Sequence, residues 1–146
     1  SFPFTHTLYD ESTPLNLSMI FSPIQDSSIV KFLLYDIILM PGEEFSYNKA
    51  TGPRSKANGY KDAPVIVNGK IQDGSGGGVC QVSTSIYNSV LYSGLEITQV
   101  RNHSLPSSYA PMGKDATVAY DYLDLKFKNT YKHPIYIHTT AYNGVI

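Results

Sequence analysis

A stretch with four glycines among six residues, at positions 73–78, limits what this chain can fold into. A run with so few side chains must be held by its backbone or by neighbours that pack against it. Immediately after it, apolar residues repeat at helical spacing from Val82 to Leu91, and Gly94 stands where a helix can end. The pattern therefore predicts a helix whose first turn contains Cys80.

Periodicity elsewhere predicts a second helix and several strands. Apolar residues in segment 29–39 recur at three- and four-residue spacing before a Pro-Gly pair, which indicates a helix. Asn68-Gly69 favours a two-residue hairpin turn. We expect strands in segments 44–48, 63–67, 70–73, 95–101, 115–120, 123–128 and 135–140. The predicted fold class is α+β, with the Cys80 helix and the 29–39 helix packed on a mainly antiparallel β-sheet.

Length and charge narrow the class of protein. The 146 residues suit a single domain over positions 1–146, and a net charge of −1 gives no surface for nucleic acid. No segment approaches the roughly 20 apolar residues that span a bilayer, so we expect no membrane contact by this part of the protein. Because the chain opens at Ser1 with no signal segment, we expect a processed or excised domain.

The single cysteine, Cys80, is a candidate nucleophile. A helix N-terminus favours the thiolate, and the preceding glycines allow a substrate carbonyl to approach backbone N–H groups that stabilise an oxyanion. The alternative is a small buried residue that only packs. One sulfur allows no internal disulfide and no cysteine-cluster metal site, and the histidines form no pair at ligand spacing. We therefore expect no metal and no cofactor.

A cysteine nucleophile needs a base, and His103 is the first choice because it ends the strand expected after the cysteine helix. His138 is the reserve. Asp115, after a glycine turn, is the preferred partner to orient the imidazole, with Asp124 as the alternative. Arg54, rather than Arg101, is the candidate for clamping a substrate carboxylate, and Tyr60, Tyr87 and Tyr109 are candidates for lining a groove.

Seven motifs, in order along the chain, resemble the VanW domain family. They are Pro41-Gly-Glu-Glu-Phe-Ser-Tyr-Asn48, Gly52-Pro-Arg54, Gly59-Tyr60, Gly76-Gly-Gly-Val-Cys-Gln81, Arg101-Asn-His-Ser104, Gly113-Lys-Asp-Ala-Thr-Val118 and Asp124-Leu-Lys-Phe-Lys-Asn129. The motif-bearing core covers about residues 40–138. Residues 1–39 form a divergent N-terminal segment, because the arginine that the family usually carries beside Asn16 is absent.

The resemblance implies a peptidoglycan L,D-transpeptidase that forms 3–3 cross-links through a cysteine thioester. Its partners would be a donor tetrapeptide stem and the amine of an acceptor stem. Family members are mainly cell-surface proteins of Gram-positive bacteria, many with a membrane anchor, and the family is named after a gene of vancomycin resistance clusters. On this resemblance Cys80, His103 and Asp115 would be catalytic, and substrate would contact Arg54, Tyr60, Gly77, Gly78, Gln81, Ser104 and Tyr109.

Two other functions fit the same residues. A non-catalytic wall-binding module would keep its affinity for peptidoglycan after Cys80→Ala. A cysteine peptidase or amidase would hydrolyse the same stems, because transferase and hydrolase differ in acceptor access rather than in nucleophile.

Overall fold

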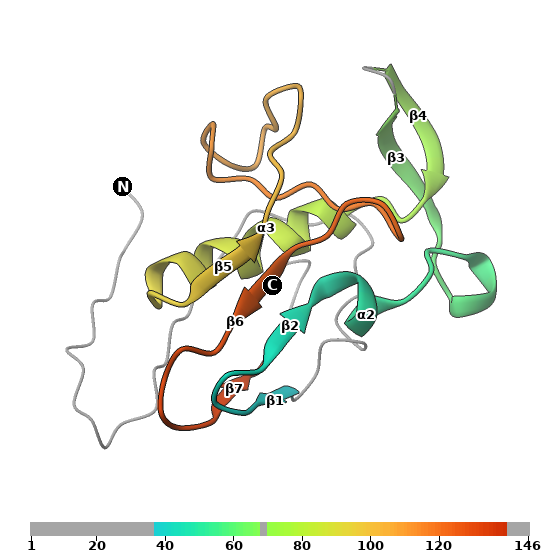
Figure 1. Ribbon diagram of the computed structural model, residues 1–146. Helices are drawn as coiled ribbons and strands as arrows, with labels where there is room; N and C mark the ends of the chain where they lie inside the picture. Colours follow the sequence, from blue (N-terminus) through green and yellow to red (C-terminus); the bar gives the residue numbers. More distant parts are fainter. Residues whose placement is uncertain (1–36, 68–69, 140–146) are drawn as a thin grey trace.

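Figure 1 shows a computed structural model of the chain, in which residues 37–67 and 70–139 are described. The described elements are helices packed against antiparallel sheets, so the predicted α+β class is confirmed. Within these ranges no helix has the length and apolar character needed to cross a membrane.

A three-stranded antiparallel sheet carries the core. Its strand order is β2 (Glu44–Ser46), β6 (Lys126–Lys128) and β5 (Glu96–Gln99). Phe45 and Phe127 are paired across β2 and β6, and their rings stack with centroids 4.7 Å apart. Phe127 is fully buried, so the middle strand anchors the hydrophobic core on which the long helix packs.

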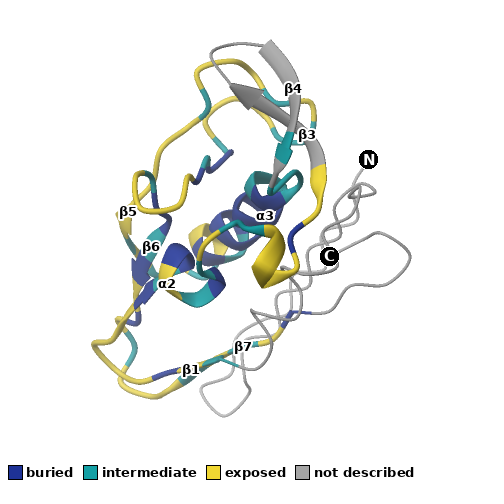
Figure 2. Cartoon of the chain, turned by 90° about the vertical axis from the view of Figure 1, so that its right-hand side faces the viewer, coloured by how far each residue is buried: buried dark blue, intermediate teal, exposed yellow. Residues whose placement is uncertain are grey.

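The long helix is α3 (Val79–Tyr92), and it is buried over most of its length (Figure 2). Its N-cap is Gly78, whose φ of 83° is a conformation that glycine adopts without strain. Cys80 therefore lies in the first turn, as the sequence predicts. The chain leaves the helix through Gly94 and turns directly into β5, which packs beside it (Figure 1).

The second helix is not the one predicted. Ile37–Leu39, the end of the expected 29–39 helix, forms strand β1, which pairs antiparallel with β7 (Ile135–Ile137). Three consecutive large apolar residues suit a strand as well as a helix, and pairing with a distant segment decided between the two. Residues 29–36 lie outside the described residues. The observed second helix is α2 (Tyr47–Thr51), which follows β2 without a break.

The predicted hairpin is confirmed. β3 (Asp62–Val67) pairs antiparallel with β4 (Lys70–Ser75), and the Asn68-Gly69 turn itself lies outside the described residues. A short 3-10 helix, η1 (Lys56–Asn58), precedes the hairpin, which projects from the body near the start of α3 (Figure 1). The glycine loop at positions 76–78 thus joins the hairpin to the cysteine helix.

Candidate active site

Cys80 is presented where the glycine loop becomes helix α3. The helix N-terminus has no side-chain cap, so its first N–H groups are not bonded to a capping side chain. Gly76 has a φ of 99°, and a Cβ at this position would come within 3.0 Å of Cγ of Arg54. The loop can therefore take this path only because it lacks side chains. The result is a partly exposed thiol beside backbone donors.

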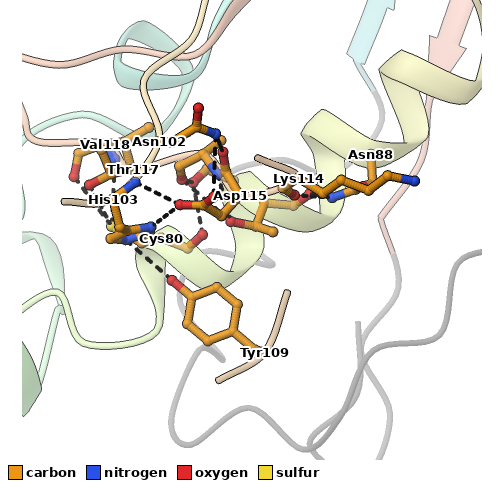
Figure 3. Close-up of polar contacts among 12 residues, drawn as sticks. Cys80, Asn88, Asn102, His103, Tyr109, Lys114, Asp115, Thr117 and Val118 are labelled. Carbon is orange, nitrogen blue, oxygen red and sulfur yellow. Dashed lines mark hydrogen bonds and ion pairs between the residues drawn. The ribbon is translucent and has the colours of Figure 1, made fainter. Parts of the chain in front are cut away.

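His103 and Asp115 form a tight pair next to this thiol (Figure 3). Nδ1 of the imidazole lies 2.6 Å from Oδ2 of Asp115, and the backbone N–H of His103 donates to the same oxygen at 2.6 Å. The side chains of His103 and Asp115 are 15% and 7% exposed, so water screens the pair only weakly. Asp115 thereby fixes the imidazole with Nδ1 toward the carboxylate.

The imidazole of His103 also lies close enough to the Cys80 side chain to shift the pKa of both groups. Because Nδ1 is bonded to Asp115, Nε2 is the nitrogen left for the thiol. Further contacts to Sγ come from the hydroxyl of Thr117 at 3.8 Å and from the N–H of Val118 at 3.5 Å. The three residues predicted as catalytic are therefore brought together in one chain of contacts.

The pKa shifts describe a group arranged for proton transfer. Burial alone would raise the pKa of Cys80, but hydrogen bonds from His103, Val118 and Thr117 outweigh it and lower that pKa. The bond to Cys80, with a smaller contribution from Asp115, raises the pKa of His103 despite burial. For Asp115 burial is again the largest opposing effect, yet the bonds from His103 lower its pKa. All three shifts favour a thiolate, an imidazolium and a carboxylate.

A polar face of α3 holds the segment that carries Asp115. Ser83 Oγ donates to the carbonyl of Ala116 at 2.6 Å, and Thr84 Oγ1 accepts from the N–H of the same residue at 3.0 Å. Asn88 Nδ2 donates to the carbonyl of Lys114 at 2.7 Å. The prediction of a strand over segment 115–120 was wrong, because its backbone pairs with helix side chains rather than with a strand.

Two residues outside the predicted triad, Asn102 and Tyr109, contact the His103–Asp115 pair. Asn102 donates to the carbonyl of Asp115 at 2.7 Å and to its Oδ1 at 3.3 Å. The hydroxyl of Tyr109 lies 3.3 Å from Nε2 of His103, and the two rings meet edge to face. Burial raises the pKa of Tyr109 strongly, so its hydroxyl stays protonated. The sequence signal that could have identified Asn102 is its position directly before His103.

Other predicted substrate contacts lie elsewhere or remain predictions. Tyr60 is buried in the core, with its hydroxyl donating to the carbonyl of Thr51 at 3.0 Å. Arg54 donates to Asn48 Oδ1 at 2.7 Å and to the carbonyl of Gly52 at 3.0 Å, so it packs behind the glycine loop. The other four predicted contacts lie close to Cys80 or His103 in the sequence and are partly or fully exposed. They are Gly77, Gly78, Gln81 and Ser104.

The histidines and the aspartate weighed as alternatives to His103 and Asp115 have other partners. His138 and His133 stack on Tyr136 and Tyr131, next to β7. Asp124 caps the start of α2 and has no contact with an imidazole among its hydrogen bonds within the described ranges. In the part of the chain that the structure describes, no three His, Cys, Asp or Glu side chains are placed to hold a metal ion.

The fold and the site define an α+β domain in which a helix-borne cysteine lies beside a histidine–aspartate pair. Comparison gives the family: residues 28–146 match the family described as VanW like protein, and the chain belongs to it. The resemblance read from the motifs is thereby confirmed.

Two curated relatives agree with this family. The chain is 43% identical over 107 residues to the uncharacterized protein YoaR of Bacillus subtilis, covering 73% of the chain and 35% of that protein. It is 30% identical over 127 residues to the vancomycin B-type resistance protein VanW of Enterococcus faecalis, covering 84% of the chain and 46% of that protein. The chain thus spans less than half the length of either relative. No solved structure matches it significantly.

Proposed function

We propose that this domain is a peptidoglycan L,D-transpeptidase that forms 3–3 cross-links through a cysteine thioester. The observation that carries the proposal is the hydrogen-bonded cluster of Cys80, His103 and Asp115 at the glycine loop. Family membership and the similarity to a vancomycin resistance protein support a role in the cell wall. Acyl transfer needs a nucleophile, a proton shuttle and oxyanion donors, and this site offers all three.

In the first half-reaction the Cys80 thiolate attacks the carbonyl carbon of the third residue of a donor tetrapeptide stem. A C–S bond forms, and the C–N bond to the terminal D-alanine then breaks. The imidazolium of His103 gives its proton to the leaving amine. The pKa directions of the pair match this requirement, because a thiolate must attack and a cation must donate.

In the second half-reaction the amine of the diamino acid on an acceptor stem attacks the thioester. His103 takes the proton from this amine, the new amide bond forms, and the thiolate leaves. Asp115 stabilises the imidazolium whenever His103 carries the proton. Each turnover therefore returns the site to its starting charges.

The glycine loop serves the oxyanion in this proposal. Gly77 and Gly78 leave room for the substrate carbonyl, and the N–H of Cys80 at the uncapped start of α3 stabilises the negative oxygen. The N–H groups of Val79 and Gln81 already donate to the carbonyls of Gly76 and Gly78. The Tyr109 hydroxyl, 3.3 Å from Nε2 of His103, stands where the leaving or attacking amine must pass. Arg54, Tyr60, Gln81 and Ser104 stay predictions as substrate contacts.

We place the domain outside the cell, at the surface or wall of a Gram-positive bacterium, because its proposed substrate lies there. In the longer protein a membrane anchor would hold it near that substrate. Peptidoglycan stem peptides, as donor and acceptor, are the proposed partners. A hydrolase would use the same acyl-enzyme with water as the acceptor, so only the products separate the two reactions.

The test is incubation of the purified protein with disaccharide-tetrapeptide, followed by mass spectrometry of protein and products. We expect a thioester adduct and a cross-linked dimer, both absent with Cys80→Ala and strongly reduced with His103→Ala. The matched control is His133→Ala, whose exposed ring stacks on Tyr131 and should leave turnover unchanged. A shortened monomer without dimer would identify a hydrolase. Equal binding by wild type and Cys80→Ala without any turnover would favour a wall-binding module.

A further inference from the structure

A polar groove of about 380 Å³ opens beside α2, and Cys80 does not line it. Its walls come from α2, the end of β5, the start of β6 and the turn at positions 119–123. Figure 1 shows α2 next to the segment that leads into β6. The volume lies within the range of small-ligand sites in proteins.

The base of the groove is fixed by hydrogen bonds. Asn48 Nδ2 donates to the carbonyl of Ala119 at 3.1 Å and to that of Leu123 at 2.8 Å. The carboxylate of Asp124 accepts from Ser46 Oγ at 2.6 Å and from the N–H of Asn48 at 2.8 Å. These bonds tie the turn to α2, so the residues at the turn's surface are displayed by a rigid support.

The surface of the groove combines exposed rings with charges of both signs. Tyr122 is 82% exposed and offers a flat apolar face, whereas Tyr120 is 45% exposed and has the guanidinium of Arg54 over its ring, 5.5 Å from the centroid. Lys49 and Lys126 add two positive charges, and Asp121 and Asp124 add two negative ones. An anionic peptide end would require an excess of positive charge. A neutral ligand rich in hydroxyl and amide groups, such as a saccharide, matches this lining better.

Two connections link the groove to the thiol. The N–H of Val118 lies 3.5 Å from Cys80 Sγ, and Tyr120 follows two residues later in the same segment. On the other side, Arg54 donates to Asn48 and packs against Gly76 of the glycine loop. The groove is therefore built on segments that also contact the thiol and the glycine loop.

We propose that this groove binds the N-acetylated glycan strand of the polymer whose stem peptide is attacked by Cys80. That the saccharide and the stem belong to one polymer rests on the proposed function. The exposed ring of Tyr122 stacks on a sugar ring, while Lys49, Gln99 and Lys126 exchange hydrogen bonds with hydroxyl and acetamido groups. The groove selects the substrate by its sugar rather than by its peptide.

The first experiment measures binding without catalysis. Cys80→Ala protein is titrated with a soluble β-1,4-linked N-acetylglucosamine tetrasaccharide by calorimetry. We expect binding, weakened at least about fivefold by adding Tyr122→Ala. The matched control is Tyr136→Ala, which removes a tyrosine 59% exposed on β7, away from the groove. Absence of binding, or equal affinity with and without Tyr122, would overturn the proposal.

The second experiment separates this inference from the transpeptidase proposal. With Cys80 intact, Tyr122→Ala should raise KM for disaccharide-tetrapeptide about fivefold and leave KM for the free tetrapeptide unchanged. An equal change with both substrates would contradict the groove. If neither substrate is turned over but the tetrasaccharide still binds through Tyr122, the glycan groove stands and the proposed catalysis fails.

Discussion

Two buried aspartates, Asp115 and Asp124, do different work in this domain although they resemble each other in burial. They are 5% and 8% exposed, and both accept several hydrogen bonds. Asp115 accepts from an imidazole that itself contacts a thiol. Asp124 accepts from a hydroxyl and from backbone N–H groups at the start of α2.

The difference teaches that the partner of a buried carboxylate matters more than its burial. A carboxylate bonded to a titratable ring changes the charge that the ring carries, and this influences a reaction. A carboxylate bonded to backbone donors closes a helix end and stabilises the fold. The same contrast separates His103, which contacts Asp115 and Cys80, from His133, which stacks on a tyrosine.

The largest effect should come from the nucleophile. We expect Cys80→Ala to reduce formation of the cross-linked dimer to less than about one-thousandth of wild type. The free energy of unfolding should change by less than about 1 kcal/mol, because the sulfur is only partly buried. Product analysis and urea denaturation of the same samples measure the two effects. A variant that still forms dimer would contradict the role of Cys80.

The next effect should come from the proton shuttle. We expect His103→Ala to lower kcat/KM by about 10² to 10⁴, because the leaving amine then lacks a proton donor. His138→Ala is the control, because His138, just after β7, is the other histidine weighed as base. Steady-state kinetics on both variants measure the difference. If His138→Ala had the larger effect, the assignment of the base would be wrong.

Asp124→Ala should change stability rather than chemistry. Its loss leaves Ser46 and the buried N–H of Asn48 without their acceptor, at a cost of about 2 to 4 kcal/mol. Urea denaturation at neutral pH measures this cost. The pH at which Cys80 ionises should stay as in wild type. A shift of that pH without loss of stability would contradict the structural role assigned to Asp124.

Asp115→Asn should change the rate less than His103→Ala does, by about tenfold to a hundredfold, because the His103 contact with Cys80 remains. The reaction needs a Cys80 that has lost its proton and a His103 that has kept its own, so activity is bell-shaped with pH. Asp115 raises the pKa of His103, and its neutralisation should move the alkaline limb to lower pH. The pH profile of kcat/KM measures this. An unchanged alkaline limb would contradict the proposed role.

Local patterns were enough to predict the cysteine helix and the hairpin, and they singled out Cys80, His103 and Asp115 as candidates. The glycine run, the apolar repeat and the motif around His103 are all contained in short segments. Contact between Cys80, His103 and Asp115 was a hypothesis from chain order, and the structure brings the three side chains together. Their chemical roles stay predictions until turnover is measured.

Long-range pairing explains what the sequence could not supply. Ile37–Leu39 has an apolar pattern that fits two structures, and only its distant partner β7 makes it a strand. Segment 115–120 alternates like a strand, yet the inward polar residues of α3 take its backbone bonds. Arg54 was predicted to clamp a substrate carboxylate, but it donates to Asn48, which lies in a helix that the sequence periodicity did not indicate.

The most direct test of the site is a titration of the Cys80 thiolate by its ultraviolet absorbance, in wild type and in His103→Ala. The chain has a single cysteine and twelve tyrosines, so the absorbance of each protein minus that of its Cys80→Ala counterpart reports on this cysteine. We expect the wild-type pKa to lie below that of an ordinary cysteine and to rise in His103→Ala, because the hydrogen bond from the imidazole is lost. A wild-type pKa at or above the ordinary value, or one that His103→Ala leaves unchanged, would contradict an activated nucleophile.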